Sequence, residues 1–180
     1  MSIGTFTRGL AALPSLNDVT VEDLQAFRRI AFDRRLRSGS CLARAGQPTA
    51  GTWLLVGGEV ELLAEVGELG LSVDQLAAGR WVNPSCAIDG GPAGWTAIAT
   101  TEVQAWLLTP DSYRRLTANS GILARRLVRM LARAVVDDGD LAGRVAARVQ
   151  RVVPANGKTL QREDLLRMGF ARTVFGEPAA

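Results

Sequence analysis

Seven short runs of apolar or alternating residues, separated by glycine-containing turns, fill residues 32–109 and constrain the fold more than any other feature of the sequence. The turns recur about every ten residues, which favours an antiparallel sandwich or barrel because no helix fits between successive runs. Gly57 and Gly58 stand between two of the runs and predict a hairpin turn. We therefore expect strands at residues 32–37, 41–44, 52–56, 59–64, 69–76, 96–100 and 103–108.

Helical patterns flank this β-rich segment on both sides. Thr20 stands where it can cap a helix, and Asp23 can return a hydrogen bond from the third helical position. After the last predicted strand, residues 110–116 form a short helical pattern and Ser120 begins a longer one. Strands that are grouped together, with helices before and after them, predict an α+β protein.

The longer helix carries an apolar stripe in which residues recur at steps of four, three and four. Such heptad spacing is typical of a helix that packs along one side. The stripe can cover the β-segment or join two copies of the chain, and we favour a homodimer because the helix after Thr20 can already cover the β-segment. The predicted dimer stripe consists of Leu123, Leu127, Met130 and Ala134.

An Asp-Asp-Gly-Asp sequence at residues 137–140 interrupts the helical pattern. We expect the helix to break there and Asp140 to cap the next one, because these residues favour caps and turns. A final short helix is expected from Leu160 to Met168. The chain would then consist of residues 1–136, which include the β-segment and the dimer helix, and a small helical region at 137–180.

The composition excludes the commonest catalytic chemistries. The chain has no histidine, which rules out Ser-His-Asp and Cys-His catalysis and histidine-metal sites, and its two cysteines cannot complete a four-ligand metal site. We therefore expect a non-enzymatic protein with no catalytic residue, no metal and no cofactor. No apolar run approaches the ~18 residues of a membrane span, and no signal-like segment opens the chain, so we expect a cytoplasmic protein without membrane contact.

Charge is unevenly distributed along the chain. Residues 1–113 carry 8 Arg against 12 acidic residues, whereas residues 114–172 carry 12 Arg and 1 Lys against 5 acidic residues. A basic C-terminal third is typical of a surface for nucleic acid or for an acidic partner, although many charge runs are only solvated faces. The possible phosphate contacts are Arg144, Arg148, Arg151, Lys158, Arg162 and Arg172.

The order of the elements and the glycine spacing resemble those of a cyclic nucleotide-binding domain. Residues 35–61, with Gly39 and Gly46, are similar to the turn glycines that lead into that family's third and fourth strands. Residues 79–82 stand where the family has a glycine, an acidic residue and an aromatic residue before its ligand cassette, and residues 101–109 resemble its last strand. The resemblance implies a jelly-roll-like antiparallel β-roll flanked by helices, followed by a long helix and a small helical C-terminal region.

The C-terminal part is similar to the catabolite-activator (Crp/Fnr) regulators. Residues 140–146 resemble the segment that opens their DNA-binding domain, and residues 159–166 resemble the first helix of their helix-turn-helix. The start of a recognition helix would occupy residues 172–175, about one turn, before Gly176-Glu177-Pro178, and so short a helix is marginal. We expect DNA binding to be weak or non-specific at most.

The ligand cassette departs from the family pattern. In that family a glutamate binds the ribose hydroxyl and an arginine pairs with the cyclic phosphate. Here the glutamate position falls at or beside Pro84, the arginine position falls at residues 93–95, and no arginine or lysine stands between Arg80 and Arg114. Residues 53–111 carry one arginine against eight acidic residues. We therefore expect cyclic mononucleotides such as cAMP and cGMP to bind weakly or not at all.

Another ligand, such as a cyclic dinucleotide or a different small molecule, remains open. Backbone N–H groups of the glycine-rich segment could hold an anion, and two tryptophans could line an apolar pocket, although tryptophans are more often core. Cys86 in the same stretch is expected to be a buried, inert thiol. The pocket candidates are Trp81, Asn83, Ser85, Asp89, Gly90, Gly91, Trp95 and Thr96.

These features together predict a non-enzymatic regulatory protein. Its sensor domain would have lost cAMP and cGMP binding, and it would act as a homodimer through a protein partner or a non-standard ligand. The alternative is a DNA-binding transcriptional regulator of the Crp/Fnr type, which requires a helix that enters a DNA groove.

Overall fold

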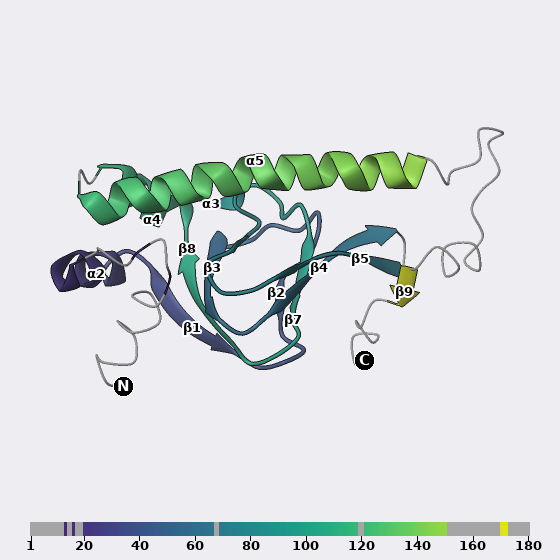
Figure 1. Ribbon diagram of the computed structural model, residues 1–180, viewed down its shortest axis with the longest axis horizontal. Helices are drawn as coiled ribbons and strands as arrows, with labels where there is room; N and C mark the ends of the chain where they lie inside the picture. Colours follow the sequence, from purple (N-terminus) through teal and green to yellow (C-terminus); the bar gives the residue numbers. More distant parts are fainter. Residues whose placement is uncertain are drawn as a thin grey trace.

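Two antiparallel sheets packed on each other form the body of the protein (Figure 1). The first sheet has the strand order β1-β8-β3-β6 and the second the order β2-β7-β4-β5-β9. The computed structural model describes Leu13, Leu16 and residues 20–66, 69–118, 121–150 and 170–172. The strands are Phe32–Leu36 (β1), Cys41–Ala43 (β2), Thr52–Gly57 (β3), Val60–Val66 (β4), Leu69–Leu76 (β5), Trp81–Val82 (β6), Thr96–Ala99 (β7), Val103–Leu108 (β8) and Phe170–Arg172 (β9).

The seven strands expected from the sequence are all present, with ends that differ by two residues at most. The antiparallel β-roll is therefore confirmed. Strand β6 was not expected, because a strand of two residues is too short to show an alternating pattern.

Strands β3 and β8, at the centre of the four-stranded sheet, are buried on both faces. Leu54 of β3 packs with Trp106 of β8 beneath the helices, whereas Leu55 packs with Ala105 between the two sheets. Trp106 is fully buried, and its ring centroid lies 5.3 Å from that of Phe27. Because successive strand residues point to opposite faces, burial on both sides explains why β3 and β8 are continuous apolar runs.

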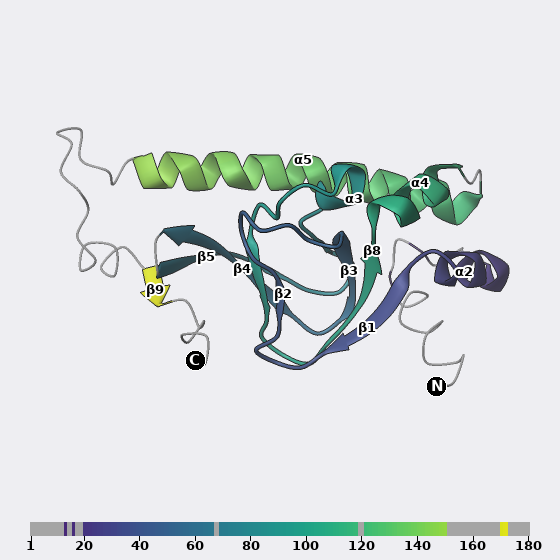
Figure 2. The ribbon, with the colours of Figure 1, turned by 180° about the vertical axis from the view of Figure 1, so that it is seen from behind.

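Helices cover the outer face of this sheet, and α5 runs along the roll from α2 and α4 at one end towards β5 at the other (Figures 1 and 2). The cap predicted for α2 is confirmed, because the Thr20 Oγ1 accepts the Asp23 N–H at 3.2 Å. The helices are Val21–Arg28 (α2), Cys86–Asp89 (α3), Pro110–Ala118 (α4) and Ile122–Gln150 (α5).

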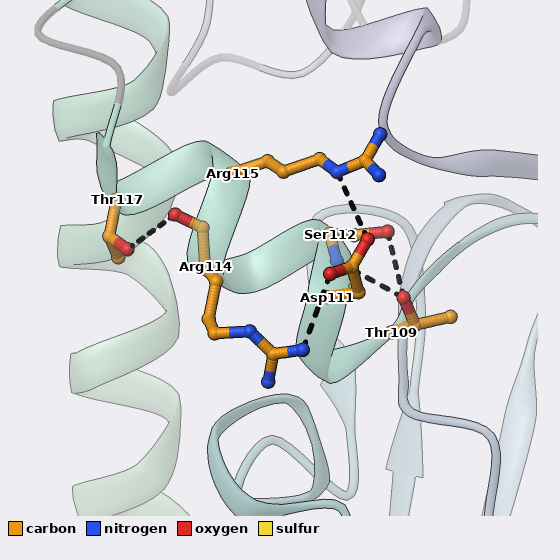
Figure 3. Close-up of polar contacts among 6 residues, drawn as sticks. All are labelled: Thr109, Asp111, Ser112, Arg114, Arg115 and Thr117. Carbon is orange, nitrogen blue, oxygen red and sulfur yellow. Dashed lines mark hydrogen bonds and ion pairs between the residues drawn. The ribbon is translucent and has the colours of Figure 1, made fainter.

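Polar contacts at the start of α4 turn the chain directly from β8 into the helical layer (Figure 3). The Thr109 Oγ1 accepts the Ser112 N–H at 3.1 Å and lies 2.9 Å from the Ser112 hydroxyl. Asp111, in the first turn, pairs with Arg114 at 3.2 Å and with Arg115 at 3.0 Å. These ion pairs are exposed, so they contribute little to stability. The Thr109 cap is therefore the contact that directs the chain into α4.

Helix α5 continues through residues 137–140, so the predicted helix break is wrong. Leu131 before this segment is 1% exposed and Leu141 after it is 8% exposed. Their burial outweighs the cost of Gly139 inside a helix, which is about 1 kcal/mol. The boundary predicted between residues 136 and 137 therefore lies within one continuous helix.

Leu123 and Leu127 of the predicted dimer stripe face the chain's own β-roll, so these two side chains do not form a dimer seam while the helix stays on the roll. Leu123 is 4% exposed and Leu127 is 0% exposed, and both belong to the cluster that contains Trp106. Met130 and Ala134 are half-buried against the same cluster. Side chains without exposed surface cannot contact a second copy unless the helix leaves the roll.

Gly57 and Gly58 carry the chain from one sheet to the other, so the predicted hairpin turn is wrong. Strand β3 pairs with β6 and β8, whereas β4 pairs with β5 and β7. Gly58 has a φ of 78°, and a Cβ built on it would lie 2.2 Å from the carbonyl oxygen of Glu102. Only glycine fits where the backbone passes this close to the start of β8.

The C-terminal segment contributes a strand where a recognition helix was expected to begin. Residues 170–172 pair with residues 69–71 at the edge of the second sheet, so the expectation of a helical start at Arg172 is wrong. The helix expected at 160–168 lies outside the described residues, as do Arg151, Lys158 and Arg162. The side chains of Arg148 and Arg172 are not among those described.

Replacing Gly58 by alanine is expected to lower the free energy of unfolding by about 3 kcal/mol or more, because both the positive φ and the close carbonyl oxygen penalise a Cβ. Gly39→Ala is the matched control. Gly39 has a φ of 82° but no atom within 4 Å of an added Cβ, so a loss of about 1 kcal/mol is expected there. Urea unfolding measures both, and equal losses would show that the Glu102 backbone gives way.

Candidate ligand cavity

A cavity of about 330 Å³ lies between strands β4–β6 and helix α5. Its volume falls within the range of about 300 to 1,000 Å³ that is usual for small-molecule sites. The apolar part of the wall consists of Leu62, Leu76, Trp81, Pro84, Ala134 and Leu141. The charged part consists of Asp74, Arg80, Asp137, Asp138, Asp140 and Arg144.

The charged side chains give the cavity an acidic character. The Nη2 atom of Arg80 lies 3.7 Å from the Oδ2 atom of Asp74 in an exposed ion pair, so these two charges largely balance each other. Within the part of the chain that the structure describes, Asp137, Asp140 and Arg144 form no ion pair. The other charged groups of the wall are three carboxylates of α5 and the guanidinium group of Arg144. Because the carboxylates are more numerous, the local potential is negative.

Asp138 connects helix α5 to the β-roll. The indole Nε1–H of Trp95 donates to its carboxylate at 2.6 Å, across 43 positions of sequence. Burial raises the pKa of Asp138 above its ordinary value, and the hydrogen bond from Trp95 opposes that rise. The contact fixes one carboxylate of the cavity in place.

Asn83 holds together the two segments that flank α3. It is 1% exposed and has a φ of 50°, a conformation that asparagine tolerates better than most residues. Its Nδ2–H donates to the Trp95 carbonyl oxygen at 3.0 Å, and its Oδ1 accepts the Trp95 N–H at 2.9 Å. The side chain is thus engaged within the protein and does not line the cavity.

The backbone N–H groups around α3 are also engaged. The Gly90 N–H donates to the carbonyl oxygen of Cys86 at 3.2 Å, and the Gly91 N–H donates to the Asp89 carboxylate at 2.9 Å. An anion would have to displace these bonds before it could bind there. The N–H groups at the start of α3 donate to backbone carbonyl oxygens. The Cys86 N–H donates to Asn83 at 3.1 Å, that of Ala87 to Pro84 at 3.4 Å and that of Ile88 to Ser85 at 2.9 Å.

The eight predicted pocket residues do not form one site. Trp81 lines the cavity, and Trp95 reaches it through Asp138. Ser85 and Asp89 lie at the two ends of α3, with Gly90 and Gly91 directly after it. Thr96 is buried between strands, where it accepts the Ala45 N–H at 2.9 Å and donates to the Glu65 carboxylate.

Sequence reasoning missed the carboxylates that α5 contributes, because a helix break was expected at that segment. The excess of acidic residues over residues 53–111 was a signal for an acidic site. The same reasoning correctly expected Cys86 to be buried: it is 1% exposed, and burial raises the pKa of its thiol. Among the described residues, no helix is both long and apolar enough to cross a membrane.

The two sheets and the covering helices have the architecture of the cyclic nucleotide-binding fold. Residues 33–120 match the family model described as a cyclic nucleotide-binding domain. The resemblance noted in the sequence is thereby confirmed for the fold. No curated protein sequence matches the chain.

Solved structures with this fold include a catabolite activator protein and a global regulator. The catabolite activator protein of Thermus thermophilus aligns with a TM-score of 0.59 and 19% identity, over 75% of this chain and 63% of its own length. The c-di-GMP responsive global regulator CLP of Xanthomonas campestris aligns with a TM-score of 0.57 and 18% identity, over 76% of this chain and 66% of its own. The present chain thus spans less than two thirds of either regulator.

A third structure matches over nearly the whole chain. A cyclic nucleotide-binding domain from Methylobacillus flagellatus aligns with a TM-score of 0.60 and 18% identity, over 88% of each chain. Identities this low establish the shared fold and leave the ligand and partners to be inferred from this chain's own residues.

Substitution of Asp138 tests the link between α5 and Trp95. Burial raises the pKa of Asp138, so the folded state binds the proton more tightly than the unfolded state does. The wild type therefore loses stability as the pH rises from the ordinary pKa of an aspartate through the pKa of Asp138 in the folded state. Asp138→Asn keeps an acceptor for the indole N–H and should be at least as stable at neutral pH, without that loss. Asp138→Ala leaves the N–H without an acceptor and should lose about 1 to 3 kcal/mol.

Urea unfolding of the three proteins from acidic to neutral pH makes the comparison. An Asn variant no more stable than the Ala variant would contradict this account, because the negative charge itself would then be holding Trp95.

Proposed function

We propose that this chain is a non-enzymatic regulatory protein whose cyclic nucleotide-binding-type domain has lost cAMP and cGMP binding. In this proposal it acts as a homodimer, through a protein partner or a non-standard ligand. The observation that carries the proposal is the acidic cavity, in which Asp137, Asp138 and Asp140 stand against Arg144. The two free cysteines fit a reducing compartment, which supports a location in the cytoplasm.

The family's two partners for a cyclic nucleotide are missing from the cassette, and the guanidinium groups of Arg80 and Arg144 at the cavity wall are outnumbered by carboxylates. Pro84, at or beside the position where the family resemblance implies a ribose-binding glutamate, lines the cavity without a carboxylate. Between Arg80 and Arg114 the sequence has no cation to pair with phosphate. The N–H groups of Gly90 and Gly91, which could substitute for a cation, already donate within their own loop. A phosphate placed here would lose its hydration and gain repulsion from the carboxylates.

Titration calorimetry with cAMP and with cGMP is expected to show no binding tighter than about 1 mM. A cyclic dinucleotide titrated in parallel tests whether a larger ligand behaves differently. Dissociation constants in the low micromolar range for either mononucleotide would contradict the proposal, because Arg80 or Arg144 would then outweigh the carboxylates of the cavity wall.

The dimer surface in this proposal lies on a different face of α5 from the one that the sequence predicted. A second stripe with heptad spacing stands beside the buried face, and its members are exposed or half-exposed: Val128, Ala132, Val135, Gly139, Ala142 and Ala146. An added Cβ at Gly139 would meet nothing within 4 Å, so the stripe is open at its centre. Small apolar side chains let two helices pack closely, and α5 is long enough to align with a second copy along the whole roll.

Ala132→Glu is expected to convert the dimer into a folded monomer, because it places a charge in the middle of this second stripe. Arg133→Glu is the matched control: it introduces the same carboxylate one residue away, on an exposed position outside the stripe, and should leave the dimer intact. Light scattering on a sizing column gives the mass, and circular dichroism confirms folding. A monomeric wild type, or a dimeric Ala132→Glu variant, would contradict the assignment.

The basic C-terminal third favours a second candidate, a DNA-binding regulator of the Crp/Fnr type. In that case Arg144 and the other predicted phosphate contacts would bind the DNA backbone. Arg172, however, ends a strand in the structure instead of beginning a helix. Recovery of a reproducible two-fold symmetric DNA site at physiological salt would favour this candidate over a regulator that acts through protein contacts.

A further inference from the structure

The cavity combines an apolar wall with carboxylates that form no ion pair with any residue that the structure describes. Leu62, Leu76 and Trp81 contribute apolar surface from the β-roll, whereas Asp137 and Asp140 are exposed carboxylates of α5 without an ion-pair partner among the described residues. Asp138, in the same helical turn, is held by Trp95. A ligand that matches this wall has an apolar body and a positive charge.

Trp81 adds an independent requirement. Its side chain lines the cavity and is only 5% exposed, and its indole N–H has no acceptor in the described protein. A buried donor without a partner costs roughly 1 to 3 kcal/mol, so an acceptor supplied by a ligand would relieve that cost. The indole ring can also stabilise a neighbouring cation through its π face.

The spread of the carboxylates distinguishes an organic cation from a metal ion. No group of three or more metal-ligating side chains is close enough, among the residues that the structure describes, to hold a metal. The charge must therefore be carried by a larger group that reaches one or two carboxylates by hydrogen bonds, as an ammonium or a guanidinium does.

We propose that the cavity binds a small organic cation, an amine or guanidine with an apolar body and a hydrogen-bond acceptor. Its charged group pairs with Asp137 and Asp140, its body lies against Leu76 and the Trp81 ring, and its acceptor receives the Trp81 N–H. The inference rests on the proposed function, because it names the class of the non-standard ligand in that same site. Arg144 and Arg80 at the wall are offset by the more numerous carboxylates.

Three probes with nearly the same aromatic body and different charge test the class: tyramine, 4-ethylphenol and 3-(4-hydroxyphenyl)propionate. Titration calorimetry at low salt is expected to give an affinity for tyramine at least about tenfold above that for the neutral phenol, with the carboxylate weakest. Raising the salt concentration should reduce the difference between tyramine and the neutral phenol.

Paired variants locate the site. Asp137→Asn with Asp140→Asn is expected to weaken tyramine about tenfold while leaving 4-ethylphenol unchanged. The control, Glu22→Gln with Glu102→Gln, removes the same charge at two exposed positions away from the cavity and should have little effect. Trp81→Phe removes the N–H donor and should weaken tyramine and 4-ethylphenol alike, while preserving the preference for the cation.

Binding of the carboxylate probe as tightly as tyramine, absence of binding by all three probes, or equal losses in the paired variants and their control would overturn this inference. None of these outcomes decides the proposed function, which fails instead on micromolar cAMP or cGMP binding. The two ideas can therefore be rejected separately.

Discussion

The packing of helix α5 on the β-roll is the interaction on which the rest of the structure depends. Leu123, Leu127 and Leu131 close the cluster beneath the helices, and Leu141 reaches the cluster between the two sheets. Each such side chain contributes about 1.5 to 3 kcal/mol when it is fully removed from water. One helix therefore seals two cores and also supplies a wall of the cavity, so the geometry of the cavity is coupled to the stability of the fold.

The local pattern of the sequence predicted the strands well because alternation and turn glycines report directly on strand geometry. It failed where a longer-range contact decides the outcome. A heptad stripe shows that Leu127 is buried but does not show against which surface, and glycines such as Gly58 show a sharp change of direction but not which strands pair. The helix break expected at Gly139 depended on local propensity, which is weaker than the burial of Leu131 and Leu141 on either side.

The sequence predicted the negative charge of the candidate site but not which residues form it. The excess of acidic residues over residues 53–111 and the proline at position 84 indicated that a phosphate would find little support. The carboxylates of α5 lie far along the chain from the cassette, and only the fold brings Asp138 to Trp95. Asn83 and Gly91 are residue types that suit a ligand site, yet their polar groups form hydrogen bonds that hold the loop itself.

Strand β9 has a consequence for how the chain reaches its native state. It pairs with residues 69–71 from a position about 100 residues later, and closing so long a loop is entropically costly and slow compared with forming the local pairs. During synthesis, the edge of β5 emerges well before the strand that covers it. Until residues 170–172 arrive, the unpaired backbone groups of that edge are open to pairing with another chain, so the growing polypeptide passes through a state that is prone to aggregation.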